Sequence, residues 1–149
     1  MKTGRIQDGA LRAAALGAAL CAAAAGAGCP ERIGGKCDNS LDCSSERTRL
    51  CDISQPGGYC LIPGCEAGGS VCPHEASCVA FRDTAESFCL RACERDAQCR
   101  DGYVCCVPEA DAGIAILPLP DGGVPANGDP GYCIAADPDT GARPTGCAP

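Results

Sequence analysis

The apolar positions of this chain follow two contrasting patterns that meet near residue 28. Ahead of that point, the basic residues Lys2, Arg5 and Arg12 lead into a run of small apolar residues, 13–27, that carries no charge. A basic start followed by a short apolar run is typical of a secretory signal peptide, and this run is shorter than the roughly 20 residues that a spanning helix needs. We therefore predict that residues 1–28 are a signal peptide with a helical apolar segment.

After residue 28, the apolar pattern predicts only sparse secondary structure. Turn-forming pairs at Gly57-Gly58 and Asp101-Gly102 stand directly ahead of short strand-like runs, which predicts small β-hairpins. One stretch, 84–95, has apolar residues at helical spacing and predicts one or two helical turns. Elements this short are not stable alone, so other interactions must hold them.

Cysteines supply those interactions, and they recur with a period. The chain holds 16 cysteines in 149 residues, and Cys37, Cys65 and Cys93 stand 28 residues apart. Each opens a block of four cysteines, which predicts a repeated unit. We divide the chain into a tether (29–36), block 1 (37–64), block 2 (65–92) and block 3 (93–149). The cysteines that we expect to form disulfides are Cys37, Cys43, Cys51, Cys60, Cys65, Cys72, Cys78, Cys89, Cys93, Cys99, Cys105, Cys106, Cys133 and Cys147.

Block 3 resembles block 1 with a long insertion. Gly58-Tyr59-Cys60 is matched by Gly131-Tyr132-Cys133. The insertion, residues 107–132, lies between Cys106 and Cys133 and is rich in Pro and Gly, which predicts a loop. Within that loop, the apolar run 113–119 is the exception. It can cover the small core, add an edge strand or meet a partner.

Composition agrees with a fold held by cross-links. With two Phe, three Tyr and no Trp, the chain lacks the aromatic residues of an ordinary core. Cysteine at this density stays oxidised only outside the cytoplasm. The predicted fold class is a small disulfide-rich protein with little regular secondary structure, short β-hairpins and an N-terminal signal helix.

The end of the signal peptide offers two interpretations. Small residues at 25–28 precede Cys29, and AGAGC resembles the lipobox of bacterial lipoproteins, although Gly26 stands where that family has a large aliphatic residue. The resemblance implies that Cys29 is lipidated and becomes the N-terminus. Lipidation would also leave fourteen cysteines, an even number that can pair completely. The alternative is cleavage after Ala27 and simple secretion.

A second resemblance covers part of block 3. Cys93, Cys99 and the pair Cys105-Cys106 reproduce the C-x5-C-x5-C-C signature of the whey acidic protein four-disulfide core, including its Asp, here Asp96. The later cysteines are too far apart for that family. The resemblance implies bridges from Cys72 to Cys106, Cys89 to Cys133, Cys93 to Cys105 and Cys99 to Cys147. If the blocks are the true units, bridges instead stay within blocks, joining the first cysteine to the third and the second to the fourth.

Charge and motifs exclude several functions. Residues 1–28 hold three basic groups and one acidic group, a net charge of +2, so the whole-chain charge of −7 leaves −9 for residues 29–149. An acidic chain without a basic stripe is a poor nucleic-acid binder. The single histidine, His74, lies in no zinc or hydrolase motif. We expect no enzyme activity, no cofactor and no metal site.

These observations predict a non-enzymatic interaction or structural module of the bacterial cell envelope, lipid-anchored through Cys29, with an unidentified protein partner. The localisation is extracytoplasmic, either anchored or secreted. The alternative function is a secreted serine protease inhibitor, which the resemblance to whey acidic protein implies. By that analogy the reactive stretch would be Val79 to Phe88.

Overall fold

The computed structural model describes residues 32–69, 71–118 and 131–148. The predicted signal peptide, Cys29 and residues 119–130 of the predicted loop lie outside these residues. The regular secondary structure within the described residues is mostly antiparallel strand, with one α-helix of four residues, α1 (Ser40–Cys43), and one short 3₁₀ turn, η1 (Asp96–Gln98). The strands are β1 (Leu50–Asp52), β2 (Tyr59–Pro63), β3 (Ala76–Phe81), β4 (Glu86–Cys93), β5 (Tyr103–Pro108), β6 (Ile114–Ile116), β7 (Gly131–Ala135) and β8 (Cys147–Ala148). No helix in this part of the chain is long and apolar enough to cross a membrane.

Each block builds the same antiparallel pair of strands. Block 1 pairs β1 with β2, block 2 pairs β3 with β4, and block 3 pairs β5 with β7. In all three pairs the third and fourth cysteines of the block are direct cross-strand partners: Cys51 with Cys60, Cys78 with Cys89 and Cys105 with Cys133. The 28-residue period of the sequence is therefore a structural repeat.

The disulfides follow the within-block order, first cysteine to third and second to fourth. A seventh bridge joins the two cysteines left over in block 3. Of the four bridges that the resemblance to whey acidic protein implies, only Cys93–Cys105 is present. The full set is Cys37–Cys51, Cys43–Cys60, Cys65–Cys78, Cys72–Cys89, Cys93–Cys105, Cys99–Cys133 and Cys106–Cys147.

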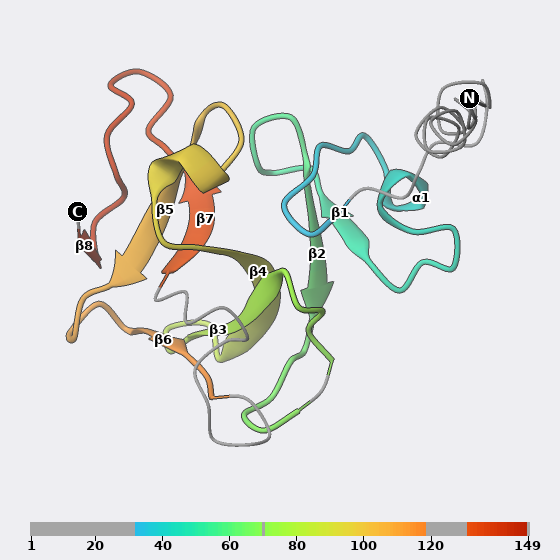
Figure 1. The fold of residues 1–149 in the computed structure, drawn as a ribbon, viewed down its shortest axis with the longest axis horizontal. Helices are drawn as coiled ribbons and strands as arrows, with labels where there is room; N and C mark the ends of the chain where they lie inside the picture. The colour runs from blue at the N-terminus through green and yellow to red at the C-terminus, as the bar shows by residue number, and fades with distance from the viewer. Residues whose placement is uncertain (1–31, 70, 119–130, 149) are drawn as a thin grey trace, which may run out of the picture.

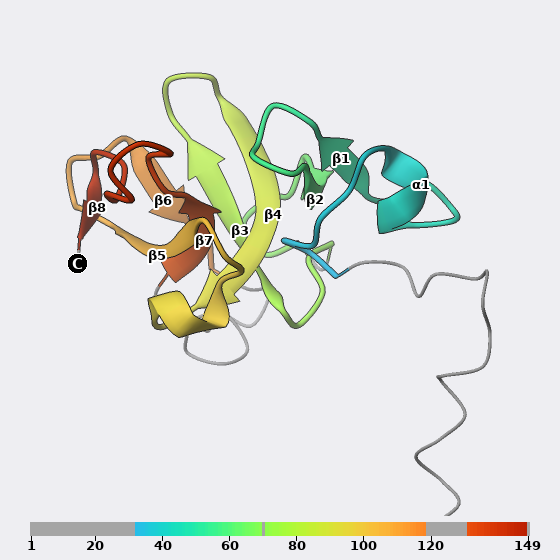
Figure 2. The same ribbon diagram turned by 90° about the horizontal axis from the view of Figure 1, so that it is seen from above.

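Strand β4 joins the three blocks into one sheet. It pairs with β3 along most of its length, while β2 and then β7 pair with its opposite edge. The continuous path through the sheet is β1-β2-β4-β7-β5-β8. Figures 1 and 2 show the result: β4 stands between the β1–β2 pair with α1 on one side and the β5–β7 pair with β8 on the other.

The helical turns predicted for 84–95 are wrong, because this stretch forms strand β4. Its apolar residues satisfy helical spacing, but Phe88, Leu90 and Ala92 also alternate, and a short window does not separate the two periods. Pairing with β3 makes this stretch a strand rather than a helix, since β3 and β4 share six register pairs from Ala76↔Arg91 to Phe81↔Glu86.

The turn and loop predictions have mixed outcomes. Gly57 and Gly58 lie in the turn of the β1–β2 hairpin, as expected. Gly102 precedes β5, but the ladder partner of β5 is β7, far along the chain, rather than the segment before the turn. Within the predicted loop, Ile114–Ile116 forms the edge strand β6 on β3, and its isoleucines pack against the core.

One core is shared by all three blocks. Its buried members include Tyr59 and Leu61 from block 1, Val79 and Leu90 from block 2, and Tyr132 from block 3. Because strand residues alternate between faces, Tyr59 and Leu61 lie on the side of their hairpin opposite Cys60. The six disulfides within the repeat pattern thus lie away from the face that carries these core side chains, whereas the seventh, Cys106–Cys147, is part of the shared core.

Candidate binding pocket

The shared core opens to solvent through a pocket of about 140 Å³. No block forms this pocket alone, because residues of blocks 1, 2 and 3 line it together. Most of its surface is apolar, with two polar side chains from the β1–β2 hairpin. The lining residues are Asp52, Gln55, Tyr59, Leu61, Phe81, Phe88, Leu90, Tyr103, Cys133 and Ile134.

Tyr59 is the best-fixed side chain of the pocket. It is 3% exposed, its hydroxyl donates to the carbonyl of Cys133 at 3.0 Å, and the same oxygen accepts from the N–H of Arg91 at 3.0 Å. Burial raises the pKa of Tyr59 well above its usual range. This one hydroxyl joins block 1 to blocks 2 and 3. The Tyr59 ring, which forms one wall of the pocket, is therefore fixed relative to both of these blocks.

Tyr103 stacks on Tyr59 and extends the aromatic wall. Their ring centroids are 5.4 Å apart, and the Arg100 guanidinium carbon lies 4.1 Å from the centroid of Tyr103. The Nη2 group of Arg100 also donates to the carbonyls of Pro56 and Gly58. Because Arg100 clamps the β1–β2 turn against the ring, the turn that carries the polar end of the pocket is fixed relative to its aromatic wall.

The β3–β4 hairpin supplies a second group of apolar side chains. Phe81 and Phe88 lie with ring centroids 6.2 Å apart, and Leu90 is buried next to them on the same face of β4. Aromatic pairs at this separation gain about 0.5–1.5 kcal/mol beyond the burial of their area. The pocket is therefore a preformed apolar recess in a rigid scaffold.

Asp52 and Gln55 give the pocket its polar end. The Oδ1 atom of Asp52 accepts from the backbone N–H of Ser54 at 3.0 Å and from its hydroxyl at 2.6 Å. Among the described residues, no hydrogen bond or ion pair to the other oxygen, Oδ2, is found. One carboxylate oxygen thus holds the turn, and the other is available to a ligand.

Apolar side chains make up most of the pocket lining. The lining residues include no serine, lysine, histidine or free thiol that could serve as a nucleophile beside a base. His74 is exposed in the turn before β3 and is not among them. The stretch that the inhibitor analogy marks as reactive forms the β3–β4 hairpin, with Val79 fully buried.

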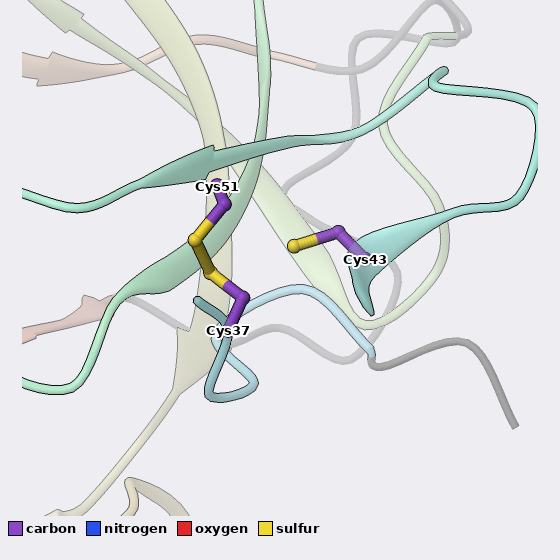
Figure 3. A group of neighbouring side chains, drawn as sticks. All are labelled: Cys37, Cys43 and Cys51. Carbon is purple, nitrogen blue, oxygen red and sulfur yellow. A yellow bond between two sulfur atoms is a disulfide. The ribbon is translucent and has the colours of Figure 1, made fainter. Parts of the chain in front are cut away.

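Clusters of sulfur atoms are the other concentration of potential ligands. In Figure 3, Cys37 and Cys51 form a disulfide and Cys43 points toward them. Three such groups in the described part of the chain, one in each block, bring their sulfur atoms within 4.8 Å. Metal ions bind thiolates, whereas all of these sulfur atoms are in disulfides. The clusters are pairs of neighbouring bridges.

The pocket itself was not predicted from the sequence. A signal for it exists, because an aromatic residue directly precedes the fourth cysteine of every block: Tyr59, Phe88 and Tyr132. Alternation along a strand places these rings on the face opposite the fourth cysteine of each block, where the blocks meet. The predicted lipidation site, Cys29, lies outside the described residues.

These features define a class: a small, disulfide-rich β protein whose cysteine blocks pack around an apolar pocket. Comparisons of the chain with family models, with curated proteins and with solved structures gave no match. The function must therefore be argued from the fold and the pocket.

Proposed function

We propose that this protein is exported, anchored to the bacterial cell envelope by a lipid on Cys29, and acts there as a non-enzymatic binding module. Seven disulfides in the described residues support export, since such bridges persist in oxidising compartments. The basic and apolar pattern of residues 1–28 supports the same address.

The observation that carries the binding role is the pocket between the blocks. A purely structural repeat needs no recess, and an apolar cavity open to solvent costs stability unless something fills it. Here the recess is lined from all three blocks and held by bridges within each of them. A site that is already rigid loses little conformational entropy when it binds, which favours affinity.

Chain length sets the distance between the anchor and the module. Cys29 precedes Arg32, the first described residue, by three positions. Three residues span at most roughly 10 Å when fully extended. A lipid on Cys29 would therefore hold the first described residues next to the membrane surface.

The anchor is tested by Cys29→Ala, with Cys21→Ala as the matched control, because both cysteines precede the described fold. We expect Cys29→Ala to lose the mass of the lipid and to move from the membrane fraction to the soluble fraction, while Cys21→Ala behaves like the parent. Intact mass with and without reduction reports the cleavage site, the lipid and the number of bridges. Unchanged mass and partitioning of Cys29→Ala would remove the anchor from the proposal.

Protease inhibition is the competing function, and the same protein tests it. Three of the four bridges implied by the whey acidic protein resemblance are absent, and Val79 of the analogous reactive stretch is buried. We expect no inhibition of serine proteases by the purified protein. Inhibition at nanomolar concentration would replace the binding module with an inhibitor.

A further inference from the structure

We propose that the pocket binds a lysine side chain presented by a basic segment of a partner protein. The aliphatic stem would enter the apolar recess, and the ammonium group would meet Asp52 at its polar end. This inference rests on the proposed binding role and specifies its ligand.

The size of the pocket selects a single side chain. Its volume of about 140 Å³ is below the roughly 300–1,000 Å³ of sites for drug-sized ligands. An apolar cavity of roughly 150 Å³ is enough to hold benzene, so the recess accommodates a short hydrocarbon group. Leu61, Leu90 and Ile134 offer aliphatic contacts to such a group, and the aromatic rings complete the lining.

The polar end of the pocket selects a cation. Asp52 is the only charged residue among those that line it, and its Oδ2 atom makes no hydrogen bond within the described residues. A lysine buries its four-carbon stem along apolar surface while its ammonium group stays at the polar margin. Tyr59 and Tyr103 add apolar area for the stem, while the Arg100 guanidinium already lies over the Tyr103 ring.

Arg100 does not already fill this role. It is not a lining residue, and its guanidinium is held on the Tyr103 ring and by the carbonyls of Pro56 and Gly58. Among the described residues the ion pairs join Arg49 to Glu75 and Arg143 to Asp96, and none of them involves Asp52. The charge of Asp52 is left for a ligand.

Charge over the whole chain favours the same partner. Residues 29–149 carry a net charge of −9, from the whole-chain −7 and the +2 of residues 1–28. A protein with this excess attracts basic segments and repels acidic ones before contact. Charge complementarity therefore holds at two scales, locally at Asp52 and globally over the mature chain.

The test is an NMR titration of the purified, oxidised protein with two capped amino acids. Nα-acetyl-lysine N-methylamide supplies the stem and the ammonium group, and Nα-acetyl-norleucine N-methylamide supplies a stem without the charge. We expect saturable shifts at Leu61, Leu90 and Ile134 with both probes, and tighter binding of the lysine probe. Asp52→Asn should weaken the lysine probe by about fivefold, the scale of a partly exposed charge pair, and leave the norleucine probe unchanged.

Asp137→Asn is the matched control. Asp137 also caps a turn through Oδ1, which accepts from the N–H of Thr140 at 2.8 Å, and it does not line the pocket. Asn at either position keeps the accepting oxygen and removes one negative charge. We expect Asp137→Asn to bind both probes like the parent.

Three results would overturn the inference: shifts that do not map to the pocket, equal affinity for the two probes, or equal weakening by Asp52→Asn and Asp137→Asn. The last result would mean that only overall charge matters. None of them bears on the lipid anchor, which the mass measurement decides. An anchored protein that does not bind the lysine probe would therefore contradict this inference alone.

Discussion

Blocks 1 and 3 carry the same tripeptide, Gly-Tyr-Cys, where the second strand of each pair, β2 or β7, begins, yet the two tyrosines differ in their contacts. The hydroxyl of Tyr59 in block 1 makes hydrogen bonds to blocks 2 and 3. The hydroxyl of Tyr132 in block 3 is fully buried and has no hydrogen-bond partner among the described residues. Block 2 has Phe88 at this place, without a hydroxyl.

The backbone of the two blocks is more alike than their side chains. In each, a short helical turn follows the first cysteine, and the side chain five residues after that cysteine accepts from the backbone N–H groups one and two residues after it. In block 1 the acceptor is Asp42 and in block 3 it is Gln98. The repeat therefore fixes a frame of turns, strands and bridges, and single side chains within that frame join the blocks.

The largest expected effect comes from the glycine of the shared tripeptide. A Cβ at Gly58 would lie 1.9 Å from the carbonyl oxygen of Cys37, and Gly58 has φ +66°. We expect Gly58→Ala to destabilise the fold by about 4 kcal/mol or to prevent folding, because backbone must move. Denaturant unfolding with intact bridges, or the yield of oxidised protein, measures this.

Gly57→Ala is its control. Gly57 has φ +72° but nothing within 4 Å of a new Cβ, so only the strained backbone conformation contributes, about 1 kcal/mol. Equal losses for the two variants would show that close approach to Cys37 does not matter.

The two tyrosines give the next effect, with opposite signs. Tyr59→Phe leaves the carbonyl of Cys133 and the N–H of Arg91 without their partner, and we expect a loss of about 2 kcal/mol. Tyr132→Phe removes a buried hydroxyl that has no partner in the described residues, so we expect a gain of about 1 kcal/mol. Equilibrium unfolding of both variants measures the difference, and losses of similar size would contradict the comparison.

Alkaline pH should affect the same residues. Burial raises the pKa of Tyr132 from 10.0 to about 12, so the folded state holds this proton more tightly than the unfolded state does. The stabilisation that protonated Tyr132 gives the folded state is complete below pH 10 and is lost as the pH rises toward 12. Midway, the free energy of unfolding should have fallen by about 1 kcal/mol. Tyr132→Phe should show a shallower decline in unfolding free energy. An unchanged slope would mean that Tyr132 does not titrate with unfolding.

The smallest expected effect is a different response to acid of the helical turns that follow Cys37 and Cys93. Hydrogen bonds from the N–H groups of Asp38 and Asn39 lower the pKa of Asp42 from 3.8, so its stabilising effect is present above pH 3.8 and is lost as pH falls through the lowered value. Gln98 makes the equivalent bonds in block 3 and does not titrate. Amide hydrogen exchange should therefore lose protection at Asn39 in acid but not at Arg95. Equal loss at both would show general unfolding.

The parts of this fold that can be predicted from the sequence are those fixed by residues close together along the chain. The cysteine period identifies the bridges within blocks, because their partners are close in the sequence, 12 to 17 residues apart in five of the seven. Pairing between blocks, such as Ile62↔Cys89 and Ala92↔Tyr132, depends on packing that no local pattern records. The misread stretch at β4 is the strand that makes these contacts.

The pocket escaped prediction for the same reason. Its lining comes from three blocks, and Asp52 looks like any turn carboxylate in the sequence. The aromatic residue before each fourth cysteine marks the face where the blocks meet, but the recess exists only after β4 has joined them. Composition had already predicted a fold held by cross-links rather than by a large core.

The order of the bridges has a consequence for how the protein matures. Every one of the seven encloses at least one cysteine that belongs to another bridge, as Cys37–Cys51 encloses Cys43. A chain that oxidises from its N-terminus and joins neighbouring cysteines as they emerge would make none of the native pairs. Wherever neighbouring cysteines join first, maturation has to pass through thiol–disulfide exchange, and we expect the yield of native protein to depend on a disulfide isomerase or a thiol redox buffer.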